Sequence, residues 1–511
     1  MPIHELVVTP KVGFDEESLE QYLLQHDHKK KGQYHEILRR SIDARQKTIK
    51  INLRVEVKDT PPEVAYVEYF KRDQNVRNAE PVIIVGAGPA GLFAAIKAIE
   101  GGLKPIILER GKDVRARRRD LAAINKEHIV NPESNYCFGE GGAGTYSDGK
   151  LYTRSKKRGS VRRVFEILVV HGATPEILFE AHPHIGTNKL PKLVTALRET
   201  IETAGGEVHF NTKVTDFIIQ NGEVKGVAVV RATGHSARDI FRLCQKRNVK
   251  IEAKPFALGV RIEHPQQLID QIQYKCADRG DYLPASAYSL VAQTRLKNVE
   301  RGVFSFCMCP GGFIVPAATA PGELVVNGMS PSRRDSRYAN SGMVVAVELA
   351  DIPQYNQYKE LAAMEFQAEV ERKAWSMGGE TQTAPAQRMV DFIEGKASGS
   401  LLDTSYQPGL ASVDMMEVLP QMIGKRLRQG FQYFGKKMRG YLTNEAQIIG
   451  VESRTSSPVR IPRDSESCEH TEISRLFPCA EGAGYAGGIV SAAMDGERCM
   501  QGVLNLYAKS N

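Results

Sequence analysis

The sequence predicts an α/β protein with a small N-terminal α/β module, a Rossmann-type α/β domain and a β-rich α+β second domain. A strand, a glycine turn, a helix and a second strand follow one another between residues 81 and 109, as in a βαβ unit. An alternating strand pattern precedes Pro61-Pro62, and the stretch 251–465 mixes many strands with few helices. The predicted parts are 1–76, 79–250 and 251–465, and residues 466–511 return to complete the domain that starts at 79.

The N-terminal module is predicted from two strand patterns and one helix. Residues 6–8 are apolar, and residues 49–57 alternate between apolar and polar side chains, as a half-buried strand does. Residues 17–24 have a helical pattern. Pro61 and Pro62 break the chain after the second strand, and the polar, basic residues 71–78 are expected to form a linker.

The βαβ unit begins directly after this linker. Residues 81–85 form a short apolar strand, and residues 105–108 form a second strand that ends at Glu109. Between them four apolar residues recur at helical spacing: Leu92, Ala95, Ile96 and Ile99. Gly101 and Gly102 are expected to end this helix, because glycine readily adopts the left-handed conformation found there.

The remaining elements are predicted from shorter patterns. Helices are expected at 190–203, 343–350, 357–375 and 489–500. Strands are expected at 207–214 and 476–480, and Asn221-Gly222 forms a turn between two strands.

Composition limits the class of protein. Of the 511 residues, 42% are hydrophobic and 25% charged, which is typical of globular domains. No apolar run reaches about 18 residues, so no membrane span is expected. The eight cysteines are scattered without a C-x-x-C, so we expect no metal and a reducing, cytoplasmic location. The net charge of +8 attracts anions, but no nucleic-acid-binding motif accompanies it. The oligomeric state stays open.

The first of three G-x-G-x-x-G matches, Gly86-Ala87-Gly88-Pro89-Ala90-Gly91, lies between the first strand and its helix. In this context Gly86 permits the tight turn, Gly88 lets a pyrophosphate approach the backbone, and Gly91 lets helix and strand pack closely. The helix N-terminus offers N–H groups to the phosphates. Glu109, 23 residues after Gly86, can accept hydrogen bonds from a ribose. The motif predicts a dinucleotide site.

The other two matches differ in context. The match at 139–144 follows residues 135–138, which form no buried strand, so we reject it as a Rossmann fingerprint. Its backbone at Gly142 and Ala143 can lie against a flat ring, or it is a plain surface loop. The match at 482–487 opens a helix, but only 24 residues follow it. It predicts either a helix N-terminus aimed at a ligand or an ordinary helix cap.

Several longer segments, together with these motifs, resemble one bacterial family. They are residues 138–151, 182–187, 232–239, 306–323, 327–336, 440–446, 451–464 and 481–498. Over nearly the whole chain the sequence is similar to the uncharacterised FAD-dependent (NAD(FAD)-utilising) dehydrogenases, within the glutathione-reductase-type FAD superfamily. Three features depart from the superfamily pattern. Arg231 puts a charge in a strand that is usually apolar, Ala480 stands where a glycine is common, and the connection from Gly222 to Ala232 is shorter than the usual β-meander.

The resemblance implies an FAD-dependent oxidoreductase that acts on a small molecule, with flavin carrying the electron transfer. Either NAD(P)H at a transient site or the substrate itself is the electron donor. Glu481 is expected to hold a ribityl hydroxyl. The cofactor contacts that we infer from the resemblance and the glycine motifs are Gly86, Gly88, Pro89, Ala90, Gly91, Glu109, Arg110, Gly142, Ala143, Val214, Thr233, Gly234, Glu481, Gly482, Gly487, Gly488 and Ile489.

Catalytic side chains are less defined than cofactor contacts. His182 and His184 flank Pro183, and histidine suits proton transfer near neutral pH. Cys309, in Cys307-x-Cys309, can place a thiol beside flavin or substrate. His184 and Cys309 are therefore candidates, each with a structural role as the alternative. Arginines that could bind an anionic substrate are Arg333, Arg334, Arg337, Arg454 and Arg460.

Two other functions remain open from the sequence. The positive charge and the basic N-terminal module allow a flavoprotein that binds or acts on RNA, which salt-dependent RNA binding would reveal. The other alternative is a module that holds FAD without turnover. Reduction of the flavin by NADH or NADPH, followed by electron transfer to a substrate, would exclude it.

Overall fold

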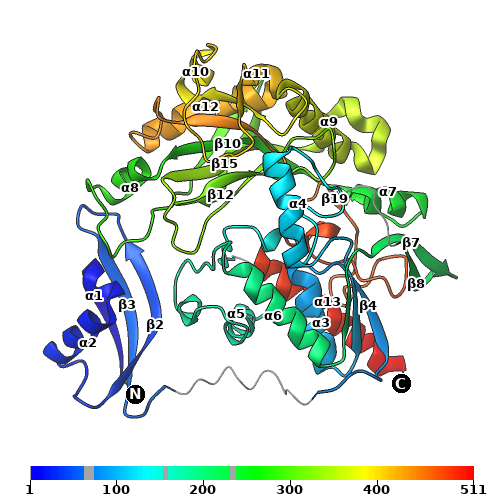
Figure 1. Cartoon of the computed structure of the whole chain (residues 1–511), viewed down its shortest axis with the longest axis horizontal. Helices are drawn as coiled ribbons and strands as arrows, with labels where there is room; N and C mark the ends of the chain where they lie inside the picture. Colours follow the sequence, from blue (N-terminus) through cyan, green and yellow to red (C-terminus); the bar gives the residue numbers. More distant parts are fainter. Residues whose placement is uncertain (1, 63–73, 154–158, 231–237, 511) are drawn as a thin grey trace.

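The structure is a computed structural model that describes residues 2–62, 74–153, 159–230 and 238–510 (Figure 1). Thr233 and Gly234 therefore lie outside the described residues. In Figure 1 the N-terminal strands stand at one side, a large sheet lies at the top, and a parallel sheet with its helices lies below that sheet. No helix in the described part of the chain combines the length and apolar character that a bilayer crossing requires.

The N-terminal module is an antiparallel sheet of order β1-β3-β2 with two helices. Its elements are β1 (Ile3–Val8), α1 (Pro10–Phe14), α2 (Glu16–Gln25), β2 (Tyr34–Asp43) and β3 (Lys50–Lys58). The alternation predicted for β3 is confirmed, because Ile51, Leu53 and Val55 are buried and the residues between them are exposed. The sequence did not predict β2, whose residues are nearly all half-buried and so show no alternation.

The βαβ unit is confirmed as β4 (Pro81–Val85), α3 (Pro89–Glu100) and β5 (Lys104–Leu108). These strands form a parallel sheet of order β4-β5-β6 with β6 (Glu207–His209). Helices α6 (Leu190–Thr203) and α13 (Ile489–Ser510) follow the predicted patterns. Almost every residue of α3 is buried, because α3 lies between the sheet and α13.

Further elements complete this part of the chain. They are α4 (Val114–Lys126), α5 (Val161–Val170), β7 (Lys213–Gln220), β8 (Glu223–Val230) and α7 (Arg238–Lys246). The turn at Asn221-Gly222 is confirmed, since it joins the antiparallel hairpin of β7 and β8. The single strand predicted for 207–214 is two elements, because β6 ends at His209 and β7 begins at Lys213.

The second domain is built on a seven-stranded mixed sheet of order β11-β12-β15-β10-β18-β16-β17. Its strands are β11 (Val291–Leu296), β12 (Val299–Cys309), β15 (Tyr338–Val347), β10 (Phe256–Pro265), β18 (Gln447–Glu452), β16 (Ala384–Arg388) and β17 (Leu410–Ser412). Short pairs are β13 (Phe313–Pro316) with β14 (Val326–Met329), and β9 (Glu252–Ala253) with β19 (Val459–Arg460). The helices are α8 (Gln266–Tyr274), α9 (Ala362–Met377), α10 (Met389–Glu394), α11 (Met415–Val418) and α12 (Gln421–Lys437).

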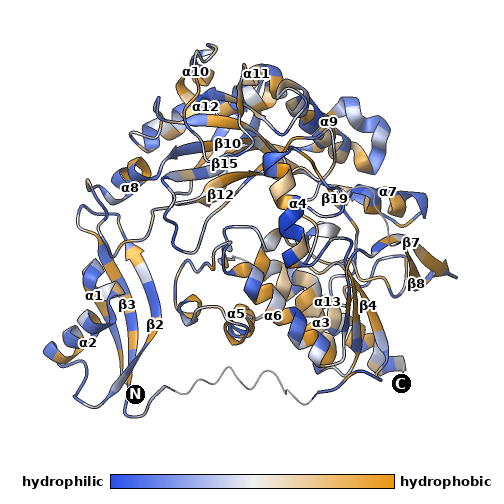
Figure 2. Ribbon diagram, viewed as in Figure 1, coloured by the Kyte–Doolittle hydropathy of each residue, from blue (hydrophilic) through white to orange (hydrophobic). Residues whose placement is uncertain are grey.

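Hydropathy follows this architecture (Figure 2). Strands β4 and β12 are largely hydrophobic and α4 is largely hydrophilic. The largest buried cluster joins strands β10, β15 and β18 to helices α9 and α12. A second cluster surrounds α3 and α6, so each of the two large parts has its own core.

Two predicted elements are wrong. Residues 343–347 lie in β15, not in a helix, because a strand buried on both faces is as continuously apolar as a buried helix. Residues 476–480 form no strand, because side chains satisfy their backbone: Arg463 donates to the Pro478 carbonyl and Asp495 accepts from the Ala480 N–H. The helix predicted at 357–375 is confirmed in α9, which begins at Ala362 after a 3₁₀ segment.

Candidate functional site

The glycine turn before α3 has the geometry that its sequence predicts. Gly86 has a φ of +99°, a conformation that side chains disfavour. A Cβ on Gly91 would lie 2.0 Å from the Gly86 carbonyl oxygen, so only glycine permits this contact. A Cβ on Gly88 would meet nothing within 4 Å, so open space faces the backbone there. No described side chain caps α3, which leaves its first N–H groups for an anion. This cradle fits a diphosphate.

Glu109 is buried and ties three segments together. Its carboxylate accepts hydrogen bonds from the N–H groups of Ala87 at 2.8 Å, Gly111 at 2.8 Å and Gly139 at 3.1 Å. A carboxylate offers about four acceptor positions, so about one is left for a ribose hydroxyl. Contact between Glu109 and a ribose stays a prediction.

The second glycine match packs against the first. The Gly141 N–H donates to the Ala87 carbonyl at 2.8 Å. A Cβ on Gly144 would lie 3.2 Å from Pro89 and 3.4 Å from Ile489, the first residue of α13. The 3₁₀ turn Gly142–Gly144 therefore lies where the start of α3 meets the start of α13. Three glycine-rich segments, distant in sequence, meet at this point.

Arg117 is a structural support of this site that sequence reasoning missed. Arg117 belongs to the basic run 115–119, which would be expected at the surface, yet its side chain is fully buried. Its guanidinium donates to the carbonyls of Asn135 at 2.7 Å, Glu140 at 2.9 Å and Gly142 at 2.9 Å. Arg117 thus fixes the glycine loop from within. The signal was available, because position 117 faces the core side of an amphipathic α4 together with Val114, Leu121 and Ile124.

The third glycine match lies before α13. Glu481 and Gly482 are exposed, and a Cβ on Gly487 would lie 3.5 Å from the Glu481 carboxyl group. The Gly488 N–H donates to the Ser491 hydroxyl at 3.1 Å. Although Glu481 is exposed, burial raises its pKa to about 7.

The other predicted cofactor residues have different settings. The Arg110 guanidinium contacts Glu133 at 2.6 Å and Asp239 at 3.1 Å. Val214 is buried in β7, opposite Val229. Cofactor contacts of both residues, like those of Thr233 and Gly234, stay predictions.

The histidine candidate lies at the seam between the two large parts of the chain. The His184 Nε2 atom lies 3.1 Å from the Ser332 carbonyl oxygen. Burial, and then the nearby Arg334 charge, lower the pKa of His184 to about 4. His184 is therefore neutral at pH 7. His182 is exposed, with its ring 5.2 Å from that of Tyr152.

The two cysteines of β12 do not share a face. In a regular strand residues i and i+2 point the same way. Here Cys307 has a φ of +42°, and the register with β15 shifts between Phe306 and Cys309. As a result Cys309 is fully buried, with its thiol donating to the Cys307 carbonyl at 3.2 Å, whereas Cys307 is exposed. Cys307, not Cys309, is the exposed residue of the pair.

The arginines expected to bind an anionic substrate are mostly paired within the protein. Arg334 contacts Asp148 at 3.0 Å. Arg454 contacts Glu323 and Glu371, each at 2.9 Å, and Arg238 contacts the same two glutamates. The remaining pairs are Arg337 with Asp403 at 3.5 Å and Arg460 with Glu252 at 3.3 Å, while Arg333 is exposed.

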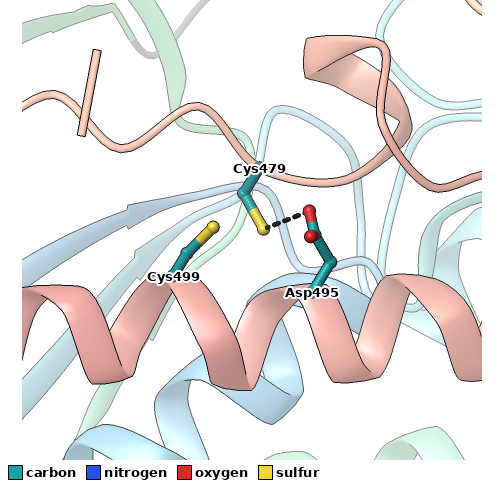
Figure 3. Close-up of side chains that lie close together, drawn as sticks. All are labelled: Cys479, Asp495 and Cys499. Atoms are coloured by element: carbon teal, nitrogen blue, oxygen red, sulfur yellow. Dashed lines mark hydrogen bonds between the residues drawn. The ribbon is translucent and has the colours of Figure 1, made fainter. Parts of the chain in front are cut away.

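One cluster has potential metal-ligating atoms. Cys479, Asp495 and Cys499 place a sulfur or oxygen atom within 4.8 Å of one another, with two of them on α13 (Figure 3). However, Arg463 donates to both carboxylate oxygens of Asp495, at 2.6 and 3.0 Å, and to the Cys499 sulfur at 3.0 Å. A permanent positive charge at this position disfavours a cation. The cluster instead holds the Ala480 N–H, which donates to Asp495 at 2.8 Å.

Two parts of the chain match families of FAD-related proteins. Residues 81–119 match an FAD binding domain, and residues 255–455 match the FAD-dependent protein, C-terminal domain-like family. Residues 1–58 match a domain of unknown function. The first match begins at β4 and includes the whole glycine turn and Glu109, so it supports FAD and a flavoprotein oxidoreductase class for this chain.

Individual proteins are similar to part or to nearly all of this chain. A thiamine thiazole synthase of Aeropyrum pernix is 30% identical over 149 residues, 29% of this chain and 43% of that protein. The structure of glycine oxidase from Bacillus cereus aligns with 84% of this chain and 96% of its own chain, at 12% identity and a TM-score of 0.30. An uncharacterised protein of Clostridium beijerinckii is 40% identical over 500 residues, 92% of each chain. The chain therefore belongs to the family of this Clostridium beijerinckii protein, and it carries an FAD binding domain and an FAD-dependent C-terminal domain.

Proposed function

We propose that the protein is an FAD-dependent oxidoreductase that acts on a small molecule at the seam between its two large parts. One observation carries this proposal: open space faces Gly88 where the uncapped start of α3, the glycine loop and the start of α13 meet. A glycine cradle at a helix N-terminus suits a diphosphate. The sheet and helices around it are those of the FAD binding domain match.

In this proposal the chain binds and orients the cofactor, which supplies electron or hydride transfer when bound. The backbone from Gly86 to Gly91 receives the diphosphate, and Glu109 accepts from the ribose. Glu481 and residues 487–489 serve the part of FAD beyond the diphosphate, where the N-terminus of α13 favours negative charge. Gly142 and Ala143 offer backbone to the flat ring. Thr233 and Gly234 are proposed contacts on the resemblance alone.

The substrate side of the site is proposed at residues that follow the glycine loop. Lys150, His184 and Cys307 are brought together there, since Lys150 bridges to His184 and donates to the carbonyl next to Cys307. Neutral His184 is suited to hydrogen bonding rather than to supplying charge at pH 7. The electron donor is proposed to be NAD(P)H at a transient site or the substrate itself.

The test compares two glutamate substitutions. Gly88→Glu places a carboxylate where no protein atom lies within 4 Å, so it disturbs the diphosphate rather than the packing. We expect it to lower FAD affinity at least about tenfold, a loss of about 1.4 kcal/mol, while wild type purifies with flavin absorbance. Gly399→Glu is the control, because Gly399 is exposed with equally open surroundings. Undiminished FAD binding by Gly88→Glu, or wild-type protein that takes up no FAD, contradicts the proposal.

A further inference from the structure

We propose that Lys150 binds an anionic group of the substrate, and that this group is a carboxylate. The inference deepens the proposed function and rests on it, because it concerns the same seam. It assigns anion binding to Lys150 instead of to the arginines that the sequence suggested. Most of those arginines are already paired with carboxylates of the protein.

Lys150 stands at the end of the glycine loop and joins three segments. It forms an isolated antiparallel bridge with His184, and its ammonium donates to the Met308 carbonyl of β12. Among the described residues, no carboxylate lies within ion-pair distance of its Nζ atom. Lys150 is only half-buried, so its ammonium keeps a route to solvent. A lysine placed inside a seam without a carboxylate partner retains donors for a ligand, since an ammonium has three.

The charges around Lys150 do not cancel its own. On the same loop Asp148 pairs with Arg334 at 3.0 Å, so those two charges offset each other. His184 is neutral at pH 7, because burial and Arg334 lower its pKa to about 4. On β12 burial raises the pKa of the Cys307 and Cys309 thiols, which therefore stay protonated. Among the described groups that face Lys150, the other charges cancel, so the net charge at this place is one positive charge, that of Lys150.

Lys150 and Cys307 lie beside each other at this seam. Lys150 contacts the carbonyl of Met308, the residue that follows Cys307, so its ammonium lies next to the Cys307 position. Burial raises the pKa of the Cys307 thiol to about 12, and the Lys150 charge opposes that rise. Charges interact more strongly in partly buried surroundings than in bulk water.

The single positive charge of Lys150 favours a singly charged anion as the ligand. A single ammonium is matched by a monoanion such as a carboxylate. A phosphate carries a second charge that Lys150 alone does not balance, and the nearby Arg334 guanidinium already pairs with Asp148. The purely structural role, in which Lys150 only supports the Met308 carbonyl, predicts no preference for anions.

The experiment is calorimetric titration of FAD-loaded protein with acetate, glyoxylate and benzoate, and with acetamide and benzamide as neutral counterparts. We expect at least one carboxylate to bind saturably and its amide to bind at least about tenfold more weakly. Lys150→Met is expected to weaken carboxylate binding at least about tenfold, and Lys150→Arg to restore part of it. Lys189→Met is the matched control, since Lys189 is exposed on the same part of the chain and its removal leaves affinity unchanged.

Several outcomes overturn the inference. They are carboxylates that bind no better than amides, an affinity that survives Lys150→Met, tighter binding of inorganic phosphate than of any carboxylate, and no saturable binding of the whole panel. The comparison of carboxylate with amide uses wild-type protein alone. It therefore tests the inference even if the Lys150→Met protein fails to fold. Failure of the proposed function is distinguishable, because it appears as protein that takes up no FAD.

Discussion

Ala480 adopts a backbone conformation that few side chains tolerate. Its φ is +55° and its ψ is −148°, in a region that glycine favours. The conformation persists because the Ala480 N–H donates to Asp495, which Arg463 holds in turn. Ala480 also directly precedes Glu481, so the strain lies at the edge of the proposed FAD site. The sequence also singles out position 480, because a glycine is common there in the superfamily that the chain resembles.

Replacement of Ala480 by glycine is expected to stabilise the protein. Relief of the conformation should raise the free energy of unfolding by about 1 kcal/mol, measured by denaturant titration. The same substitution at Ala492, inside α13, should lower the free energy of unfolding by about 1 kcal/mol, because glycine disfavours helix. Equal losses at the two positions would show that Ala480 is not strained.

His264 makes stability depend on pH. Burial lowers the pKa of this histidine to about 4, and its Nε2 atom lies 2.8 Å from the Tyr441 carbonyl oxygen. Its ordinary pKa is 6.5, so as pH falls from 6.5 to 4 the unfolded chain takes up this proton first and the folded state loses stability. Below pH 4 the loss is complete.

A glutamine at position 264 removes this titration. Between pH 7 and 4 the wild-type free energy of unfolding should fall by about 3 kcal/mol more than that of His264→Gln, at about 1.4 kcal/mol for each pKa unit. Urea titrations at several pH values measure the difference. A wild-type-minus-variant difference that stays constant with pH rules out a depressed pKa at His264.

At the scale of elements, the close packing of α13 on α3 joins the two ends of the FAD-binding part. A Cβ on Gly496 would lie 2.1 Å from the Ala90 carbonyl oxygen. Ala90 belongs to the glycine turn, so any displacement of α13 moves the proposed diphosphate cradle. The tight contact explains why a C-terminal helix distant in sequence belongs to this domain.

Gly496→Ala is therefore expected to impair both folding and FAD binding. Overpacking should cost about 2 kcal/mol of unfolding free energy and lower FAD affinity at least about tenfold. Gly399→Ala, on an exposed segment with open surroundings, should change neither quantity. Thermal unfolding and flavin titration measure the two effects. Unchanged FAD affinity in Gly496→Ala would separate α13 from the cofactor site.

Local chemistry explains which elements could be predicted from sequence. In the unit at 81–109 the apolar strands, the glycine turn and the helical spacing all indicate the same structure, and that structure is observed. Buried strands such as β15 cannot be distinguished from buried helices by periodicity. The bulge that separates Cys307 from Cys309 depends on pairing with β15. The amphipathic pattern of α4 places Arg117 on the core side, but its carbonyl partners lie on a loop up to 25 residues away, which the local pattern does not identify.

At the scale of the whole molecule, one arginine docks the N-terminal module. Arg40 of β2 contacts Glu180 and donates to the Gly13 carbonyl at 3.1 Å. Its guanidinium lies 5.1 Å from the centre of the Phe179 ring. Backbone bonds join the same place, since the Ala181 N–H donates to the Arg40 carbonyl at 3.0 Å. The module is thereby joined to the chain that leads into His184.

Arg40→Met should loosen this docking. Loss of the ion pair and its hydrogen bonds is expected to speed hydrogen exchange at the Ala181 amide about tenfold, an opening easier by about 1.4 kcal/mol. Arg39→Met is the control, because Arg39 is exposed on the neighbouring position of β2. Equally slow exchange of the Ala181 amide in both variants would show that contacts other than those of Arg40 hold the N-terminal module in place.

We propose that FAD lies across the meeting point of α3, the glycine loop and α13. A crystal structure of the protein grown with FAD is the decisive test. We expect the diphosphate against the Gly88 backbone at the start of α3, with the flavin ring directed toward the seam at Lys150 and Cys307. Side chains filling the space at Gly88, or FAD bound elsewhere on the chain, would contradict it.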